Sequence, residues 1–281
     1  MISYRAPVQD ILFTLRDVAG AHGLPDWDEG LWSEVAGAFA AFAENEIAPS
    51  NTPGDMQGCR IENRRVLMPD GYRELYRQYA DAGWQGMAVP EELGGMGLPS
   101  LLQCAVSEIF SGANHSLQMV VNLVPGASSV LQKYGTRQQQ EALIPLLASG
   151  SHLATMCITE PGAGSDLSRI RCKATETDIG WEISGEKIFI SGGDQDISEG
   201  IIHLVLASTG GGGIRGLSLF ACRSVLEDGS RNRVNVERIE EKMGLHASPT
   251  CHLHFDGARA EIIGSPGDGL KCMFAMMELL A

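Results

Sequence analysis

The chain has 281 residues, enough for two domains, and carries a formal net charge of −14. Such an acidic chain argues against general binding to nucleic acid or to anionic lipid, because both need basic surfaces. No apolar run approaches the roughly 18 residues of a membrane span, and the N-terminus lacks the basic stretch, apolar core and cleavage site of a secretory signal.

The first 150 or so residues carry apolar side chains at helical spacing. Thr136 is a favourable N-cap for the last predicted helix, and Pro49 is expected to stop the second. The polar segment Ser50–Arg65 is predicted to be a loop that can hold a short hairpin. The helices are predicted over residues 8–18, 31–42, 72–79, 99–112, 115–134 and 136–150.

From Leu153 onward the pattern changes to that of strands. Apolar pairs flank Ser184–Lys187, which predicts a hairpin there. Because no helices separate the strands, a sandwich or barrel is predicted rather than a parallel α/β sheet. Short strands are predicted at 201–207, 216–222 and 234–239, and a half-buried strand where Cys251, Leu253 and Phe255 alternate with His252, His254 and Asp256.

The last residues return to helical spacing, through Leu270, Met273, Phe274, Met277 and Leu280. The predicted fold class is therefore α+β and multidomain. An all-helical N-terminal domain is expected at 1–152, a middle β-barrel or sandwich domain at 153–267, and the start of a further helical domain at 268–281.

The stretch MCITEPGAGSD, residues 156–166, contains two glycines spaced by one residue. No third glycine follows, so the dinucleotide-binding fingerprint is incomplete. The Gly-Lys-Ser/Thr of a Walker loop and the Gly-x-Ser-x-Gly of a serine hydrolase are also absent. Two interpretations stay open: a simple turn between strands, or a loop whose glycines let a ligand approach the backbone while Thr159 and Ser165 supply hydroxyls.

The same stretch resembles the flavin-binding signature of the acyl-CoA dehydrogenases. Further motifs resemble this family in the same order along essentially the whole chain: GWQGMAVPEELGGMGLP, LQKYGTRQQQEALIPLLASG, GEKIFISGGDQD, IIHLVLAS, RGLSLF and EKMGLHASPTCHLHFDGA. The opening YRAPVQDILFTL and the later FAMM resemble the larger subgroup that includes 3-methylmercaptopropionyl-CoA dehydrogenase.

The resemblance implies a helical N-terminal domain, a middle β domain that binds FAD, and a C-terminal helical bundle. It implies that Thr159 hydrogen-bonds the flavin ring and that Ser165 also reaches the CoA arm of the thioester substrate. Phe189 stands where many members carry tryptophan, and ring stacking survives that change. The implied cofactor-binding residues are Met156, Cys157, Ile158, Thr159, Gly164, Ser165, Phe189, Ile190 and Ser191.

The implied reaction is the α,β-dehydrogenation of an acyl-CoA thioester in fatty acid metabolism, with electron transfer flavoprotein or a similar protein as acceptor. In this family the general base is a glutamate, usually in the C-terminal bundle. By resemblance, residues 268–281 are only the first helix of that bundle, and Ala281 falls where the subgroup has a CoA-site arginine. The chain is therefore expected to be truncated, to hold no catalytic base and to be inactive alone.

Two alternatives stay open beside this enzyme half, which could form homo- or hetero-oligomers. A degenerate, non-catalytic subunit that assembles with a complete dehydrogenase would carry the same motifs, and so would a non-functional remnant. Seven cysteines without a CxxC pair are expected to be reduced thiols in a cytoplasmic protein. His252 and His254 share a strand face, but with no third ligand at useful spacing no metal site is expected.

Overall fold

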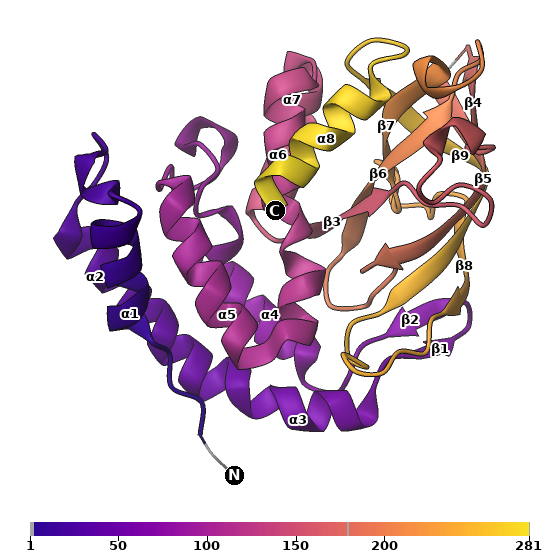
Figure 1. Cartoon of the computed structure of the whole chain (residues 1–281). Helices are drawn as coiled ribbons and strands as arrows, with labels where there is room; N and C mark the ends of the chain where they lie inside the picture. The colour runs from indigo at the N-terminus through magenta and orange to yellow at the C-terminus, as the bar shows by residue number, and fades with distance from the viewer. Residues whose placement is uncertain (1–2, 179, 281) are drawn as a thin grey trace.

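The chain folds into a helical part and a β part that lie side by side (Figure 1). The computed structural model describes residues 3–178 and 180–280. The helices α1 to α7 precede the large sheet in the chain, and a last helix, α8, returns to pack between α6 and the sheet. This order confirms the predicted α+β class.

The helical part is built around aromatic side chains. Phe39 packs with Trp84 and Phe110, with ring centroids 5.0 and 5.8 Å apart. Such rings bury large apolar areas and dominate the energy of a core. The helices are α1 (Val8–Phe13, continued by a π-helical turn), α2 (Glu29–Phe42), α3 (Ala48–Gln57), α4 (Tyr72–Asp81), α5 (Ser100–Val121), α6 (Leu123–Tyr134) and α7 (Arg137–Ala148). The predicted N-cap of α7 is confirmed, because Thr136 forms a capping box with Gln139.

Pro49 does not stop the second helix. A π-helical turn, Ala43–Ile47, joins α2 to α3, and Pro49 lies in the first turn of α3, where a missing N–H is tolerated. The loop predicted at Ser50–Arg65 is therefore wrong as far as Gln57. The short hairpin that follows is confirmed: β1 (Arg60–Glu62) pairs with β2 (Arg65–Leu67).

A break within α5 lies at Asn114, whose φ of −156° and ψ of 91° are not helical. Its side chain accepts a hydrogen bond from the Leu117 N–H at 3.1 Å and donates to the Tyr72 and Ser50 hydroxyls, both at 2.9 Å. These bonds replace helical ones, so the predicted break at this point is confirmed. The helix predicted at 115–134 is divided again at Asn122, where α6 follows α5.

The β part is a closed barrel. Strands β6, β7, β9, β5 and β4 pair in that order, and β4 pairs with β6 to complete the ring, while β3 pairs with β6 and β8 with β9. Of the two predicted alternatives, the barrel is the one that forms. The strands are β3 (His152–Cys157), β4 (Lys173–Thr177), β5 (Gly180–Ser191), β6 (Gly200–Ser208), β7 (Leu217–Arg223), β8 (Val234–Ile239) and β9 (Thr250–Ile263).

The hairpin predicted at Ser184–Lys187 is wrong, because these residues lie inside the single long strand β5. The register with β9 shifts after Ile183, where Gly257 is an extra residue on the partner strand. Gly185 marks a close approach rather than a turn. Its φ is +139°, and an added Cβ would lie 2.8 Å from the Cα of Cys172. Such a glycine in a strand is typical of a bulge or a close backbone contact.

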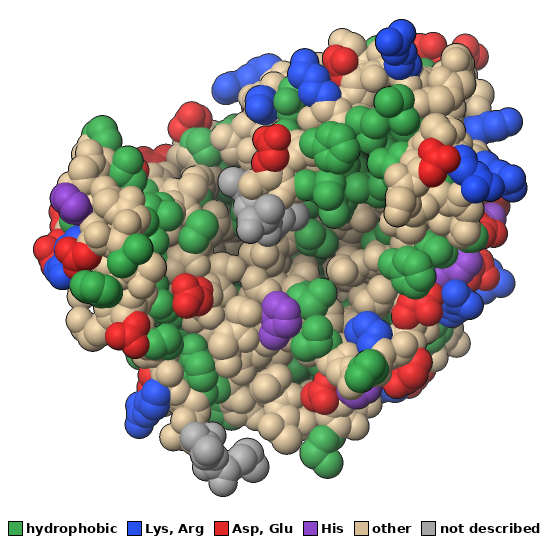
Figure 2. All heavy atoms as spheres, in the orientation of Figure 1, with side chains coloured by type: hydrophobic (Ala, Val, Ile, Leu, Met, Phe, Trp, Pro, Cys, Tyr) green, Lys and Arg blue, Asp and Glu red, His purple; other side chains and the backbone are tan. Residues whose placement is uncertain are grey.

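Helix α8 (Gly269–Leu280) packs on α6 and the barrel. Met273 is fully buried, whereas 47% of Phe274 and 40% of Met277 are exposed. The side chain of Leu280 lies outside the described residues. Hydrophobic side chains gather where α8 meets the barrel (Figure 2). Exposed apolar surface of this kind favours association with another apolar surface.

In the described part of the chain, no helix is long and apolar enough to cross a membrane. The seven cysteines are free thiols. Five of them are buried, and only Cys104 is exposed, so they act mainly as small apolar side chains.

Candidate functional site

The candidate residues come from two chain segments that meet at one surface. The first follows β3 and the second ends β5. The Ile188 N–H donates to the Thr159 carbonyl at 2.9 Å, so the segments are hydrogen-bonded side by side. The structure thus brings Ile158 and Thr159 close to Phe189, which lies 31 and 30 positions later in the sequence.

The side chains at this surface alternate between core and solvent. Cys157 and Ile190 point into the core and are at most 1% exposed, so they can reach a ligand only through their backbone. Phe189 is 57% exposed. Met156, Ile158, Thr159 and Ser191 are partly exposed. The outward side chains therefore form an apolar surface that carries two hydroxyl groups.

Phe189 is held in an unusual backbone conformation, with a φ of +61°. The pairing with β9 shifts from Lys187↔Leu253 to Ile190↔Cys251, so two residues of β5 face one residue of β9. This bulge turns the phenyl ring toward solvent. A bulky residue with positive φ costs about 1–3 kcal/mol, and such strain gathers at functional sites.

A buried ion pair supports the first segment from below. The Glu160 Oε1 accepts from Lys187 Nζ at 2.8 Å, and these side chains are 5% and 0% exposed. Lys187 also donates to the Ile158 carbonyl at 2.8 Å, while Glu160 accepts from the backbone N–H groups of Arg171 and Cys172. Glu160 is thus a structural acceptor. Sequence reasoning missed Lys187. It lies four residues after the buried Ile183 in the same strand, so alternation places both side chains on the buried face.

The turn that follows is tight and unstrained. Glu160 and Ala163 exchange two backbone hydrogen bonds of 3.1 and 3.0 Å around Pro161-Gly162. The backbone of Gly164 does not have a left-handed φ, and an added Cβ would meet nothing within 4 Å. Gly164 and Ser165 are exposed. The protein itself therefore does not require glycine at position 164, and the space above it is open to a ligand.

A polar chain lies under the first segment, inside the barrel. Thr155 Oγ1 is 2.8 Å from His203 Nδ1 and 3.3 Å from Cys157 Sγ. Burial lowers the pKa of His203 to about 3 and raises the pKa of the Cys157 thiol to about 12. Both groups are neutral and enclosed at physiological pH, so they are structural rather than reactive. Within the described residues, no cluster of three or more His, Cys, Asp or Glu is arranged to hold a metal ion.

Comparison with known proteins decides the family. Residues 33–151 match the acyl-CoA dehydrogenase N-terminal domain, and residues 155–258 match the acyl-CoA dehydrogenase middle domain. The chain belongs to the acyl-CoA dehydrogenase family.

One relative of this acyl-CoA dehydrogenase chain is the 3-methylmercaptopropionyl-CoA dehydrogenase of Ruegeria pomeroyi, 40% identical over 98% of the chain and 49% of the relative. The solved structure of Caenorhabditis elegans ACDH-11 with C11-CoA has a TM-score of 0.80 at 22% identity and covers 99% of this chain and 49% of that one. A Bacillus anthracis acyl-CoA dehydrogenase complexed with FAD has a TM-score of 0.74 at 24% identity, over 91% and 41%. These two structural likenesses show the fold.

The chain spans about half the length of the curated relatives it matches over nearly all of its own residues. The matched regions are the N-terminal and middle domains, and helix α8 follows them in the chain. The candidate surface lies on the middle domain, at the ends of β3 and β5.

Proposed function

We propose that this chain is the flavin- and thioester-binding part of an FAD-dependent acyl-CoA dehydrogenase, which removes hydrogen from the α and β carbons of an acyl-CoA thioester. One observation carries the proposal: Phe189 is exposed and strained, and it directly follows Ile188, whose N–H is bonded to the Thr159 carbonyl. A strained, solvent-facing aromatic ring has no packing role of its own, whereas an isoalloxazine ring can stack on it.

The residues at this surface fit the chemistry of FAD. Thr159 and Ser191 offer hydroxyls to the polar edge of a heterocycle, and Phe189 offers an apolar face. The open space above Gly164 lets an anionic pyrophosphate approach the backbone and the Ser165 hydroxyl. The nearby carboxylate of Glu160 is neutralised by Lys187 and does not repel that anion. We assign Met156–Thr159, Gly164, Ser165 and Phe189–Ser191 to the cofactor, and Ser165 also to the substrate.

Bound FAD would supply the acceptor for the electrons taken from the acyl chain. The residues of this chain bind and orient the ring, fix hydrogen-bond donors toward it, and keep water from its Phe189 side. We assign the catalytic base to no residue described here, since Glu160 is locked in its ion pair. Electron transfer flavoprotein is the proposed partner.

We also propose domain limits at 1–152, 153–267 and 268–281. The start of β3 at His152 and of α8 at Gly269 supports both boundaries.

The decisive experiment is a titration of the chain with FAD, in which binding is measured by the quenching of flavin fluorescence. Phe189→Gly removes the ring and also relieves the positive φ, so the variant should fold at least as stably while losing most of its FAD affinity. Phe13→Ala is the matched control, because Phe13 is 55% exposed in the first helix and should leave affinity unchanged. If the chain binds no FAD, or if Phe189→Gly binds it as tightly, the assignment is wrong. The chain can also be fused to the C-terminal helical domain of a relative. If that fusion protein binds FAD but does not oxidise acyl-CoA, the result would favour the alternative of a degenerate, non-catalytic subunit.

A further inference from the structure

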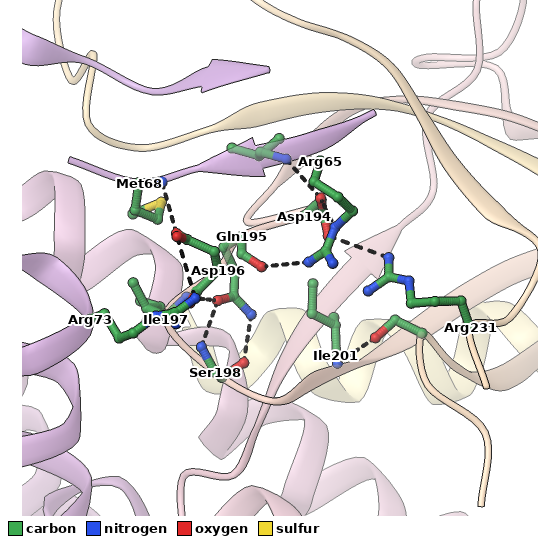
Figure 3. Close-up of polar contacts among 12 residues, drawn as sticks. Arg65, Met68, Arg73, Asp194, Gln195, Asp196, Ile197, Ser198, Ile201 and Arg231 are labelled. Carbon is green, nitrogen blue, oxygen red and sulfur yellow. Dashed lines mark hydrogen bonds and ion pairs between the residues drawn. The ribbon is translucent and has the colours of Figure 1, made fainter. Parts of the chain in front are cut away.

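We propose that Asp194 is a positioning residue, which holds the flavin-facing segment Phe189–Ser191 in place by clamping the following loop to the β1–β2 hairpin. The role in cofactor binding rests on the proposed function, whereas the clamp itself is a feature of the fold. Figure 3 shows the clamp between the hairpin and the loop that joins β5 to β6.

Asp194 is a buried carboxylate with partners from two distant regions. Its side chain is 5% exposed, and Oδ2 accepts from Arg65 Nε at 2.7 Å and from the Val66 N–H at 2.8 Å. Arg231, from the segment between β7 and β8, places Nη2 3.8 Å from Oδ1 (Figure 3). The charge-assisted hydrogen bond from Arg65 is stronger than a neutral one, and Arg231 adds an ion pair without a hydrogen bond.

The rest of the loop is held in the same way. Asp196 accepts from the Met68 N–H at 2.9 Å through its side chain and from Arg73 Nε at 2.7 Å through its carbonyl. The Gln195 side chain accepts from the N–H groups of Ile197 and Ser198, at 2.7 and 2.8 Å. The loop is therefore a rigid polar connection and not a flexible link (Figure 3).

Only two glycines separate the clamp from the flavin-facing segment. Gly192 donates to the Pro249 carbonyl at 2.8 Å and Gly193 to the Ile190 carbonyl at 3.2 Å. An added Cβ on Gly193 would lie 2.6 Å from the Cβ of Cys251, so the backbone is tightly packed here and has no room to shift. A shift of Asp194 is consequently transmitted to the end of β5.

The strain at Phe189 explains why such a clamp is needed. A residue with positive φ relaxes unless the chain on both sides is fixed. On one side, the Ile188 N–H is bonded to Thr159. On the C-terminal side of Phe189, Ile190 and Ser191 pair with β9, and the Asp194 clamp follows after two glycines. Removing the Asp194 charge would leave two guanidinium groups, Arg65 and Arg231, facing each other, and their repulsion would open the loop.

Asp194→Asn tests the proposal, because it keeps the shape and an acceptor for the Val66 N–H but removes the charge. In the FAD-free chain, hydrogen exchange measured by mass spectrometry should become faster in peptides covering 188–193. FAD affinity should fall roughly tenfold, the lower end of what supporting groups cost a binding site. Arg65→Lys, which keeps the charge but not the contacts to both Asp194 and the Gln195 carbonyl, should show part of both effects.

Asp55→Asn is the matched control. Asp55 also joins the two parts of the protein, by accepting from the His246 N–H at 2.8 Å, but it is not connected to β5 through a short loop. It should leave exchange at 188–193 and FAD affinity unchanged. Equal effects of the two variants would mean that Asp194 only docks the domains, and unchanged exchange in Asp194→Asn would overturn the clamp. If the wild-type chain binds no FAD, the exchange result still decides on the clamp.

Discussion

The two segments of the candidate site reach the same surface by opposite means. The segment around Gly164 is a relaxed turn with open space above it, whereas the segment around Phe189 is strained and fixed on both sides. The glycines mark the relaxed segment in the sequence, yet the conformation that needs explanation lies at an ordinary phenylalanine. Conformational freedom and functional strain therefore occupy different positions of one site.

The largest expected effect comes from the ion pair that links the two segments. Lys187→Met should destabilise the protein by about 3–5 kcal/mol, because Glu160 would stay buried without its partner. Denaturant unfolding monitored by circular dichroism measures this loss. The double variant Glu160→Gln/Lys187→Met should regain much of it, since no isolated charge remains. A single variant as stable as the wild type would show that the pair does not support the turn.

Acid should loosen the first segment before the second, because His203 lies beneath it. Its pKa in the folded protein, about 3, is below the unfolded value near 6.5, so stability is complete above pH 6.5 and falls as pH is lowered toward 3. The slope in this window should reach up to about 1.4 kcal/mol per pH unit. His203→Asn should flatten it in urea unfolding measured above pH 5.2, clear of the isoelectric point near 4.9. Equal slopes in both proteins would contradict the prediction.

The Thr159 hydroxyl sharpens the comparison at the ligand. Thr159→Val removes it without changing the shape of the side chain, and should weaken FAD binding by roughly 1–3 kcal/mol if the hydroxyl bonds the ring in a dry site. Thr14→Val, which removes a hydroxyl bonded to Asp10 on the first helix, is the control and should not affect FAD. Fluorescence titration measures both. Unchanged affinity in a folded Thr159→Val protein would remove Thr159 from the site.

The smallest effect on folding is expected at the open turn. Gly164→Val should change stability by no more than about 0.5 kcal/mol, the range typical of exposed positions, and should reduce FAD binding because the side chain fills the ligand's space. Gly193→Ala, close to Cys251 in the fixed segment, should instead lower the melting temperature. Thermal melts and FAD titrations of the two variants separate these outcomes. A Gly164→Val protein that unfolds easily but binds FAD normally would make the turn purely structural.

Local spacing was enough to predict most of the architecture. The helices and the half-buried strand at Cys251–Phe255 follow from side-chain periodicity. So does the lack of α-helices between the strands of the described residues, where only short 3-10 turns occur. The prediction that Pro49 ends the second helix failed because a π-helical turn before it changes the hydrogen-bonding pattern. Apolar spacing does not reveal such a turn. The hairpin prediction at Ser184–Lys187 failed because a polar, glycine-containing segment inside a bulged strand has the same composition as a turn.

The site was predictable only in part. Motif resemblance singled out both segments of the candidate site, whose role stays a prediction. The strain at Phe189 depends on a register shift against β9, which sequence spacing cannot show. The supporting groups depend on contacts across long separations. Asp194 and Arg65 are 129 positions apart, and nothing local to either residue indicates the other.

The place of β9 at the end of the barrel has a consequence for biosynthesis. This strand pairs with β5, β7 and β8, so the barrel cannot close until Ile263 has left the ribosome. Between the emergence of β3 and of β9, translation takes on the order of ten seconds, during which apolar strands have unpaired edges. Helices α1 to α7 are synthesised before the barrel strands, so they can fold before the barrel closes. Nascent chains of this protein should therefore depend on chaperones mainly over the β region, and slower elongation there would lengthen their exposure.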